Sequence, residues 1–129
     1  MYDKLTCRAR FVAGGNTTDP PVSLTYSSVV SRDSFHIDFP LGSLNDIDIW
    51  ACYIGNAYLN EKFREKIWTK SGTKFGNDKG KVMIVIRNVY GLKSSGAAWR
   101  SMLAKMLLYL GYKLSISDMG AWMNPENKP

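Results

Sequence analysis

The sequence predicts a single domain of mixed α/β (α+β) structure that covers residues 1–129. Three observations predict it. Apolar residues recur at helical spacing between positions 99 and 110. Residues 82–86 form a β-branched run typical of a buried strand, and residues 46–51 alternate as a half-buried strand does. A chain of 129 residues with 45% hydrophobic content fits one modest domain, and no linker or internal repeat divides it.

The first predicted element is a strand over residues 4–13, where basic or polar residues alternate with apolar ones. Arg8 and Arg10 then share a face, because they are two positions apart. Two guanidiniums on one face suit a phosphate or a carboxylate, although an ordinary solvated strand face has the same pattern. The glycines and prolines of residues 14–21 predict a loop.

A helix is predicted next, from Ser31 or Asp33 as its cap to about position 44. Pro40 and Gly42 fall in its interior, where proline costs roughly 3 kcal/mol and glycine about 1 kcal/mol relative to alanine. We therefore expect either that the helix breaks near Phe39 or that the segment is damaged.

The central stretch, residues 46–60, begins as the half-buried strand and then reaches Gly55 and Asn56, a pair that favours a turn or a close backbone approach. Ala57 and Tyr58 follow at once. A strand that leads into a tight turn with an aromatic beyond it suits a binding site, although such a segment is more often plain core and turn.

Residues 70–81 are rich in glycine and lysine, which invites a phosphate-loop interpretation. The spacing excludes it, because four residues must separate the first glycine from a Gly-Lys-Ser/Thr that opens a helix. Here a predicted strand, residues 82–86, follows instead, so we expect residues 70–81 to form a basic hairpin or a connecting loop.

The most regular helix of the sequence spans the apolar stripe of positions 99–110 and is expected to form core. Ser94 or Ser95 can cap its start, and Gly111 can end it. Residues 112–118 are predicted as a further strand and residues 125–129 as an uncommitted tail.

Charge is distributed unevenly along the chain. Residues 1–61 hold four Lys/Arg and seven Asp/Glu, whereas residues 62–113 hold twelve and two, a local balance of +10. A basic block of this size favours a polyanionic partner, although a solvated basic face explains it equally well.

The remaining composition limits other classes of function. Cys7 and Cys52 are too few for a disulfide framework, and His36 has no partner at metal-ligand spacing. No run reaches the roughly 18 apolar residues of a membrane span, and residues 1–20 lack the apolar region of a signal peptide. We expect an intracellular protein, cytoplasmic or nuclear, with no membrane partner.

Four blocks, taken in order, are specific as a set: residues 8–15, 26–33, 54–60 and 90–99. With residues 111–113, Ser117, Asp118 and Trp122, they resemble the reverse transcriptase of copia-type retrotransposons from about Lys4 to Met123. The resemblance implies the fingers and the first part of the palm of a right-hand polymerase, with an incomplete antiparallel palm sheet. It also implies a truncated part of a longer polyprotein, with a nucleic-acid primer–template and deoxynucleotides as partners.

The family's chemistry is the transfer of a nucleotide to a primer 3′ end. Two divalent ions, usually Mg²⁺, support it, held by an aspartate three residues before the Asn-Ala-Tyr-Leu run and by a later Asp-Asp hairpin. Here Tyr53 occupies the aspartate position, and the sequence contains no Asp-Asp pair. A neutral phenol is a poor ligand for a hard ion, so no catalytic or metal site is expected to be intact and Mg²⁺ is not expected to bind stably.

Other positions implied by the resemblance are present. Tyr58 matches the aromatic that packs under the incoming sugar, Gly55 and Asn56 allow backbone to approach the nucleotide, and the Ile54 carbonyl faces the family's metal. The complete expected nucleotide-binding set is Arg8, Arg10, Ile54, Gly55, Asn56, Ala57 and Tyr58. The expected nucleic-acid contacts are Arg87, Lys93 and Trp99.

Three functions remain open from sequence. The first is a reverse transcriptase fragment that is inactive by itself. The second is a non-catalytic, basic nucleic-acid-binding module, in which Trp68, Tyr90 and Trp99 offer stacking surfaces. The third is a degenerate, non-functional retroelement relic.

Overall fold

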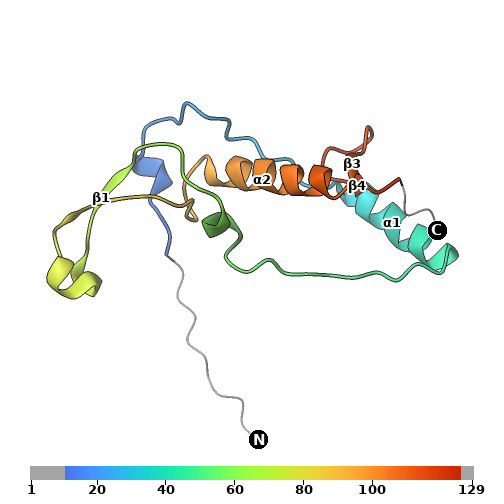
Figure 1. Ribbon diagram of the computed structural model, residues 1–129, viewed down its shortest axis with the longest axis horizontal. Helices are drawn as coiled ribbons and strands as arrows, with labels where there is room; N and C mark the ends of the chain where they lie inside the picture. The colour runs from blue at the N-terminus through green and yellow to red at the C-terminus, as the bar shows by residue number, and fades with distance from the viewer. Residues whose placement is uncertain (1–10, 126–129) are drawn as a thin grey trace, which may run out of the picture.

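The computed structural model describes residues 11–125, and its elements follow one long axis (Figure 1). Helix α2 (Ser95–Tyr109) runs through the middle. A hairpin of β1 (Trp68–Lys70) and β2 (Val82–Ile84) projects at one end. At the other end lie α1 (Arg32–Leu44) and the strands β3 (Lys113–Leu114) and β4 (Trp122–Met123). Three 3-10 turns complete the described elements: η1 (Gly15–Thr17), η2 (Ala57–Asn60) and η3 (Thr73–Asp78).

The mixed α/β prediction is confirmed, but each described sheet has only two strands. β1 pairs with β2, and β3 pairs with β4, both antiparallel. Among residues 11–125, no helix is both long and apolar enough to cross a membrane.

The prediction of a basic hairpin over residues 70–81 is confirmed. Lys70 pairs with Val82, and η3 forms the connection between the strands. The prediction that residues 82–86 are buried is wrong, because Val82, Ile84 and Ile86 are 51–70% exposed. Among residues 11–125 these strands pair only with each other, and a two-stranded ribbon by itself buries little of its apolar face.

The half-buried strand predicted at residues 46–51 is also wrong. This stretch has no regular secondary structure, and Trp50 is 88% exposed. A strand needs a partner to satisfy its N–H and C=O groups, and no described segment pairs with this stretch. The turn predicted at Gly55 and Asn56 is confirmed, with Asn56 in the left-handed region at φ 51°.

Helix α1 does not break near Phe39, so that prediction is wrong. Proline removes one intrahelical hydrogen bond, yet the helix continues past Pro40 to Leu44. The predicted Ser31 cap is confirmed, since its hydroxyl oxygen accepts from the Ser34 amide at 3.0 Å. Gly42 is buried because the returning chain places Ile49 against it.

Helix α2 confirms the strongest helical pattern of the sequence, and Gly111 follows its end with φ 87°. Neither Ser94 nor Ser95 caps it by its side chain, so that expectation is wrong. The expected core stripe is only half buried, and Met106 and Leu110 are more than half exposed. The strand predicted at residues 112–118 shortens to the two residues of β3.

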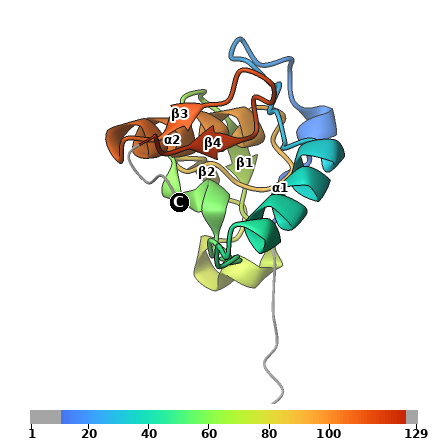
Figure 2. The same ribbon diagram turned by 90° about the vertical axis from the view of Figure 1, so that its right-hand side faces the viewer.

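The α1 end is joined to the β3–β4 hairpin by a polar clasp at Asp118, and Figure 2 views the molecule from this end. The Asp118 carboxylate accepts from the backbone amides of Ser31 and Gly120, each at 2.7 Å. Hydrogen bonds from the Ser34 side chain and from these amides hold the pKa of Asp118 well below its usual range. Gly120 is required here, because a Cβ would lie 2.2 Å from the Val30 nitrogen.

Candidate functional site

Tyr58 stands at the start of α2, held by the turn that precedes it. Asn56 directs the chain into η2, and the Leu59 amide donates to the Asn56 carbonyl at 2.9 Å. The Tyr58 ring packs on Tyr90 with centroids 4.7 Å apart and planes tilted by 34°. A Cβ on Gly96 would lie 3.6 Å from the Tyr58 hydroxyl oxygen. The aromatic expected beneath a nucleotide is therefore fixed between the segment at position 90 and the first turn of α2.

Behind this tyrosine lies a buried polar junction that the sequence did not reveal. Asn88 is 1% exposed and Ser95 is fully buried. The Asn88 side-chain amide donates to the carbonyls of Glu61 and Lys62 at 3.2 and 3.1 Å. The Ser95 hydroxyl lies 2.8 Å from the Val89 carbonyl and 3.3 Å from Asn88 Oδ1. These bonds tie the chain after Tyr58 to the start of α2. The sequence offered no pattern that predicts a role for Asn88, because it is only a polar residue that follows a predicted strand.

The N-terminal loop crosses this junction at two glycines. A Cβ on Gly15 would lie 2.0 Å from the Gly91 carbonyl oxygen, and one on Gly91 would lie 2.0 Å from the Ala13 oxygen. Gly91 also has φ 92°, a conformation that side chains with a Cβ rarely adopt. The Ala13 amide donates to the Tyr90 carbonyl at 2.7 Å. The two backbones therefore touch in a way that only glycine permits.

Two of the predicted nucleic-acid contacts, Arg87 and Lys93, lie next to this junction in the sequence. The Lys93 ammonium donates to the Thr18 carbonyl at 3.0 Å, and Arg87 Nη1 donates to the Asn60 carbonyl at 3.3 Å. Both residues are exposed, whereas Trp99 is half buried on α2. The structure thus assigns the two cations a role in holding loops, and their contact with nucleic acid stays a prediction. Arg8 and Arg10 lie outside the described residues.

Tyr53 and its neighbours do not fit a divalent ion. Tyr53 is 87% exposed within a stretch that has no regular structure, and the Ile54 side chain is 42% exposed. Mg²⁺ prefers the hard anionic oxygens of carboxylates, and a tyrosine side chain carries no carboxylate. The nearest preceding acids, Asp46 and Asp48, are also exposed. Within residues 11–125, no three acidic, histidine or cysteine side chains gather as a metal-binding group.

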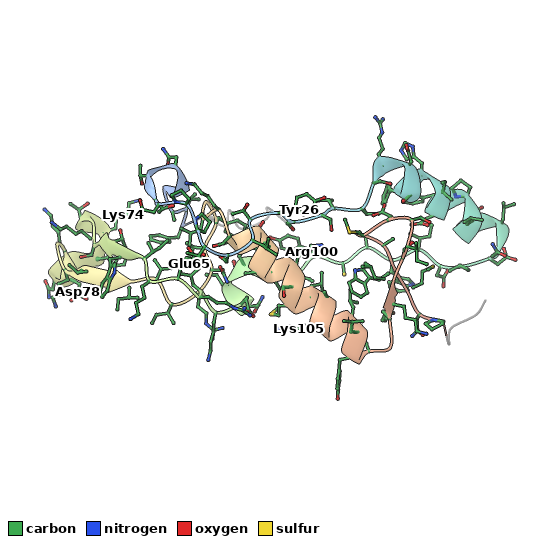
Figure 3. All side chains as sticks on the ribbon, turned by 90° about the horizontal axis from the view of Figure 1, so that it is seen from above. Tyr26, Glu65, Lys74, Asp78, Arg100 and Lys105 are labelled. Carbon is green, nitrogen blue, oxygen red and sulfur yellow. The ribbon has the colours of Figure 1, made fainter. Side chains whose placement is uncertain are left out.

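The β1–β2 hairpin bears exposed lysines and lies at one end of the molecule, apart from this junction (Figure 1). Lys74 and Asp78 lie near the tip of the molecule in Figure 3. The Lys81 ammonium pairs with Asp78 at 2.6 Å, and Trp68 is 60% exposed on β1. The exposed lysines of this hairpin are Lys70, Lys74, Lys79 and Lys81.

Comparison with known protein families shows the family to which the chain belongs. The sequence model of the family described as reverse transcriptase (RNA-dependent DNA polymerase) matches residues 3–128. The chain belongs to this family, and its relatives place it with the copia-type retrotransposons. No solved structure matches it significantly.

Two curated relatives come from Saccharomyces cerevisiae. The Transposon Ty1-BL Gag-Pol polyprotein is 31% identical over 109 residues, which are 80% of this chain and 6% of the relative. The Transposon Ty1-DR4 Gag-Pol polyprotein is 31% identical over 123 residues, 91% of this chain and 7% of the relative. The chain therefore spans only a small part of the length of these relatives.

Proposed function

We propose that this chain is a primer–template-binding part of a reverse transcriptase that does not perform nucleotide transfer unaided. The observation that carries the proposal is the exposure of Tyr53, the residue that the resemblance places where the family has an aspartate. Tyr58, packed on Tyr90 beside Gly96, supports a retained nucleotide-facing surface. The ancestral reaction is the template-directed addition of a deoxynucleotide to a primer 3′ end.

Primer extension with Mg²⁺ tests the catalytic part of this proposal. We expect neither the wild-type chain nor Tyr53→Asp to extend a labelled primer above a control without protein. The substitution restores one carboxylate, but the sequence has no Asp-Asp pair to supply the others. A reverse transcriptase of known activity serves as the positive control. Extension by either protein would show that the carboxylate argument is wrong.

A second candidate function, a non-catalytic nucleic-acid-binding module, is favoured by the projecting hairpin. Its exposed lysines share the hairpin with the exposed Trp68, a combination that suits phosphate contacts and base stacking. Neutralising phosphates releases counterions, so affinity should fall steeply as salt rises.

The test is a salt titration of binding to a primer–template duplex, comparing wild type with a Lys70→Gln, Lys74→Gln, Lys79→Gln triple variant. We expect the plot of log K against log salt to become shallower by about 0.9 for each phosphate that the variant no longer neutralises. Lys105→Gln, an exposed charge removal on α2, is the matched control and should leave the slope unchanged. Binding that barely responds to salt between about 50 and 200 mM would exclude this mode.

A further inference from the structure

A hollow of about 410 Å³ lies between residues 23–26, residues 63–65 and one face of α2. Figure 3 shows Tyr26, Glu65 and Arg100 beside this helix. Sites that hold small organic groups typically measure about 300–1,000 Å³. The hollow therefore has room for one large side chain of a partner protein.

The walls of the hollow are largely apolar. Tyr26 and Phe63 contribute aromatic rings, and Tyr26 is 71% exposed. The wall on α2 is made of small side chains: Ser94, Ala97, Ala98, Ser101 and Ala104. A flat wall of small residues beside aromatic rings suits a planar side chain, because rings prefer to stack or to meet edge to face.

Two guanidiniums give the hollow its charge preference. Arg64 and Arg100 line it from different elements. Arg64 Nη2 lies 3.9 Å from Glu61 Oε1, too far for a hydrogen bond, and the arginine side chain is 69% exposed. Arg100 donates through Nη2 to a backbone carbonyl and keeps further N–H groups. Glu65, the acid of the lining, already accepts from the Ser23 hydroxyl. The hollow is therefore suited to a carboxylate next to an aromatic ring.

The segment between α1 and η2 carries this combination. Residues 47–54 run without a turn (Figure 1), and residues 48–54 make no hydrogen bond within residues 11–125. Ile49 lies against α1, since a Cβ on Gly42 would be 3.2 Å from Ile49 Cδ1. Side chains alternate between the two sides of an extended chain. Asp48 and Trp50, the Asp48–Trp50 pair, therefore share the side opposite Ile49.

The Asp48–Trp50 pair has no partner within its own copy of the chain. Trp50 is 88% exposed, and Asp48 is exposed and forms no ion pair within residues 11–125. Neither residue lines the hollow of its own copy. Asp48 belongs to residues 1–61, with four Lys/Arg and seven Asp/Glu, whereas Arg64 and Arg100 belong to residues 62–113, with twelve and two. Opposite charge therefore attracts the pair of one copy to the hollow of another.

We propose that the Asp48–Trp50 pair of one copy docks into the hollow of a second copy. The Trp50 ring lies between Tyr26 and the small-residue wall of α2, and the Asp48 carboxylate accepts from Arg64 and Arg100. When the contact forms in both directions it closes a dimer. The proposal depends on neither the loss of catalysis nor the nucleic-acid binding proposed above.

Sedimentation velocity of the nuclease-treated full chain over a series of concentrations tests the proposal. We expect the weight-average sedimentation coefficient of wild type to rise with concentration. Asp48→Lys and Arg64→Glu each place like charges in contact and should weaken self-association by at least about 10-fold. Asp38→Lys, the same charge reversal at an exposed acid of α1, is the matched control and should associate as wild type does.

Mixing the two charge-reversal variants tests whether the two residues meet. The Arg64→Glu chain keeps a native Asp48–Trp50 pair, and the Asp48→Lys chain keeps a native hollow. Each variant alone should stay monomeric, whereas the mixture should regain association. A mixture that stays monomeric would overturn the proposal, as would a wild type that stays monomeric at its highest soluble concentration.

Two aromatic substitutions separate docking from general apolar adhesion. Trp50→Ser should abolish self-association, whereas Tyr53→Ser should keep it, although Tyr53 is 87% exposed in the same segment. The urea midpoint of each variant, measured where wild type is monomeric, should match that of wild type. Equal association of the two variants would mean non-specific adhesion and would overturn the proposal. Association that nuclease treatment removes would be bridged by nucleic acid, which would overturn it as well.

Discussion

Two regions of the molecule contrast in burial and in chemistry. One is the junction around Asn88 and Ser95, and the other is the extended segment of residues 46–54. The junction is polar, yet Asn88 and Ser95 are at most 1% exposed. The extended segment carries large apolar and aromatic side chains, yet Trp50 and Tyr53 are 88% and 87% exposed. In this chain, burial follows close backbone approach and satisfied hydrogen bonds more than it follows hydrophobicity.

Gly91→Ala should have the largest effect on this contrast. A Cβ there would lie 2.0 Å from the Ala13 oxygen, so the two backbones must separate. We expect a loss of about 3 kcal/mol or more in the free energy of unfolding, measured by urea denaturation. Gly111→Ala is the matched control, because its φ of 87° is similar but nothing lies within 4 Å of the added Cβ. It should cost only about 1–2 kcal/mol, and equal losses would show that the glycine crossing contributes nothing.

Ser95→Ala should have the next largest effect. It removes the hydroxyl near the Val89 carbonyl and Asn88 Oδ1 in a fully buried position. Leaving buried acceptors unpaired costs about 1–3 kcal/mol. Urea denaturation measures the loss, and Ser101→Ala, an exposed serine of the same helix, is the control with no expected change. If Ser95→Ala leaves the free energy of unfolding unchanged, this hydroxyl does not hold the junction together.

The Asp118 clasp should weaken only in acid. Its folded pKa lies below the unfolded value of about 3.9, so its contribution is present above that value and disappears as pH falls through the folded pKa. We expect the amide NMR signals of Ser31 and Gly120 to keep their positions down to about pH 4 and to shift only below it. Asp118→Asn should displace both signals at neutral pH. A shift midpoint near the usual aspartate value would contradict the clasp.

Trp50→Ser should have the smallest effect. A side chain that is 88% exposed contributes little packing, so the free energy of unfolding should stay within about 0.5 kcal/mol of wild type. Urea denaturation at two protein concentrations also detects self-association through this apolar segment. A loss above about 1 kcal/mol that is independent of concentration would mean that the segment is packed, and the contrast with the junction would disappear.

Local patterns predicted the elements that need no distant partner. The stripe of positions 99–110 predicted α2, and the glycines and lysines of residues 70–81 predicted the hairpin, because helix and turn propensities act within a few residues. Alternation at residues 46–51 predicted a strand wrongly, since a strand exists only where another segment pairs with it. Pro40 was also misjudged, because one missing hydrogen bond did not end a helix whose first turn is held by Ser31 and Asp118.

The candidate site divides in the same way. Tyr58 was predicted from its position in a block that resembles the family, and its nucleotide role stays a prediction. The turn at Asn56 that precedes it followed from local chemistry. Asn88 was not found, because an isolated polar residue has no sequence signal until the fold gives it neighbours.

By itself, the sequence determined the family, the basic character of residues 62–113 and the helix at α2. That Tyr53 occupies the family's aspartate position stays a prediction from the resemblance. Only the tertiary structure decided which side chains are buried and that Gly15 and Gly91 cross. It alone also packed the Tyr58 ring on Tyr90. The physical reason is distance along the chain: propensity and charge are properties of neighbouring residues, whereas packing and hydrogen-bond satisfaction join residues that are tens of positions apart.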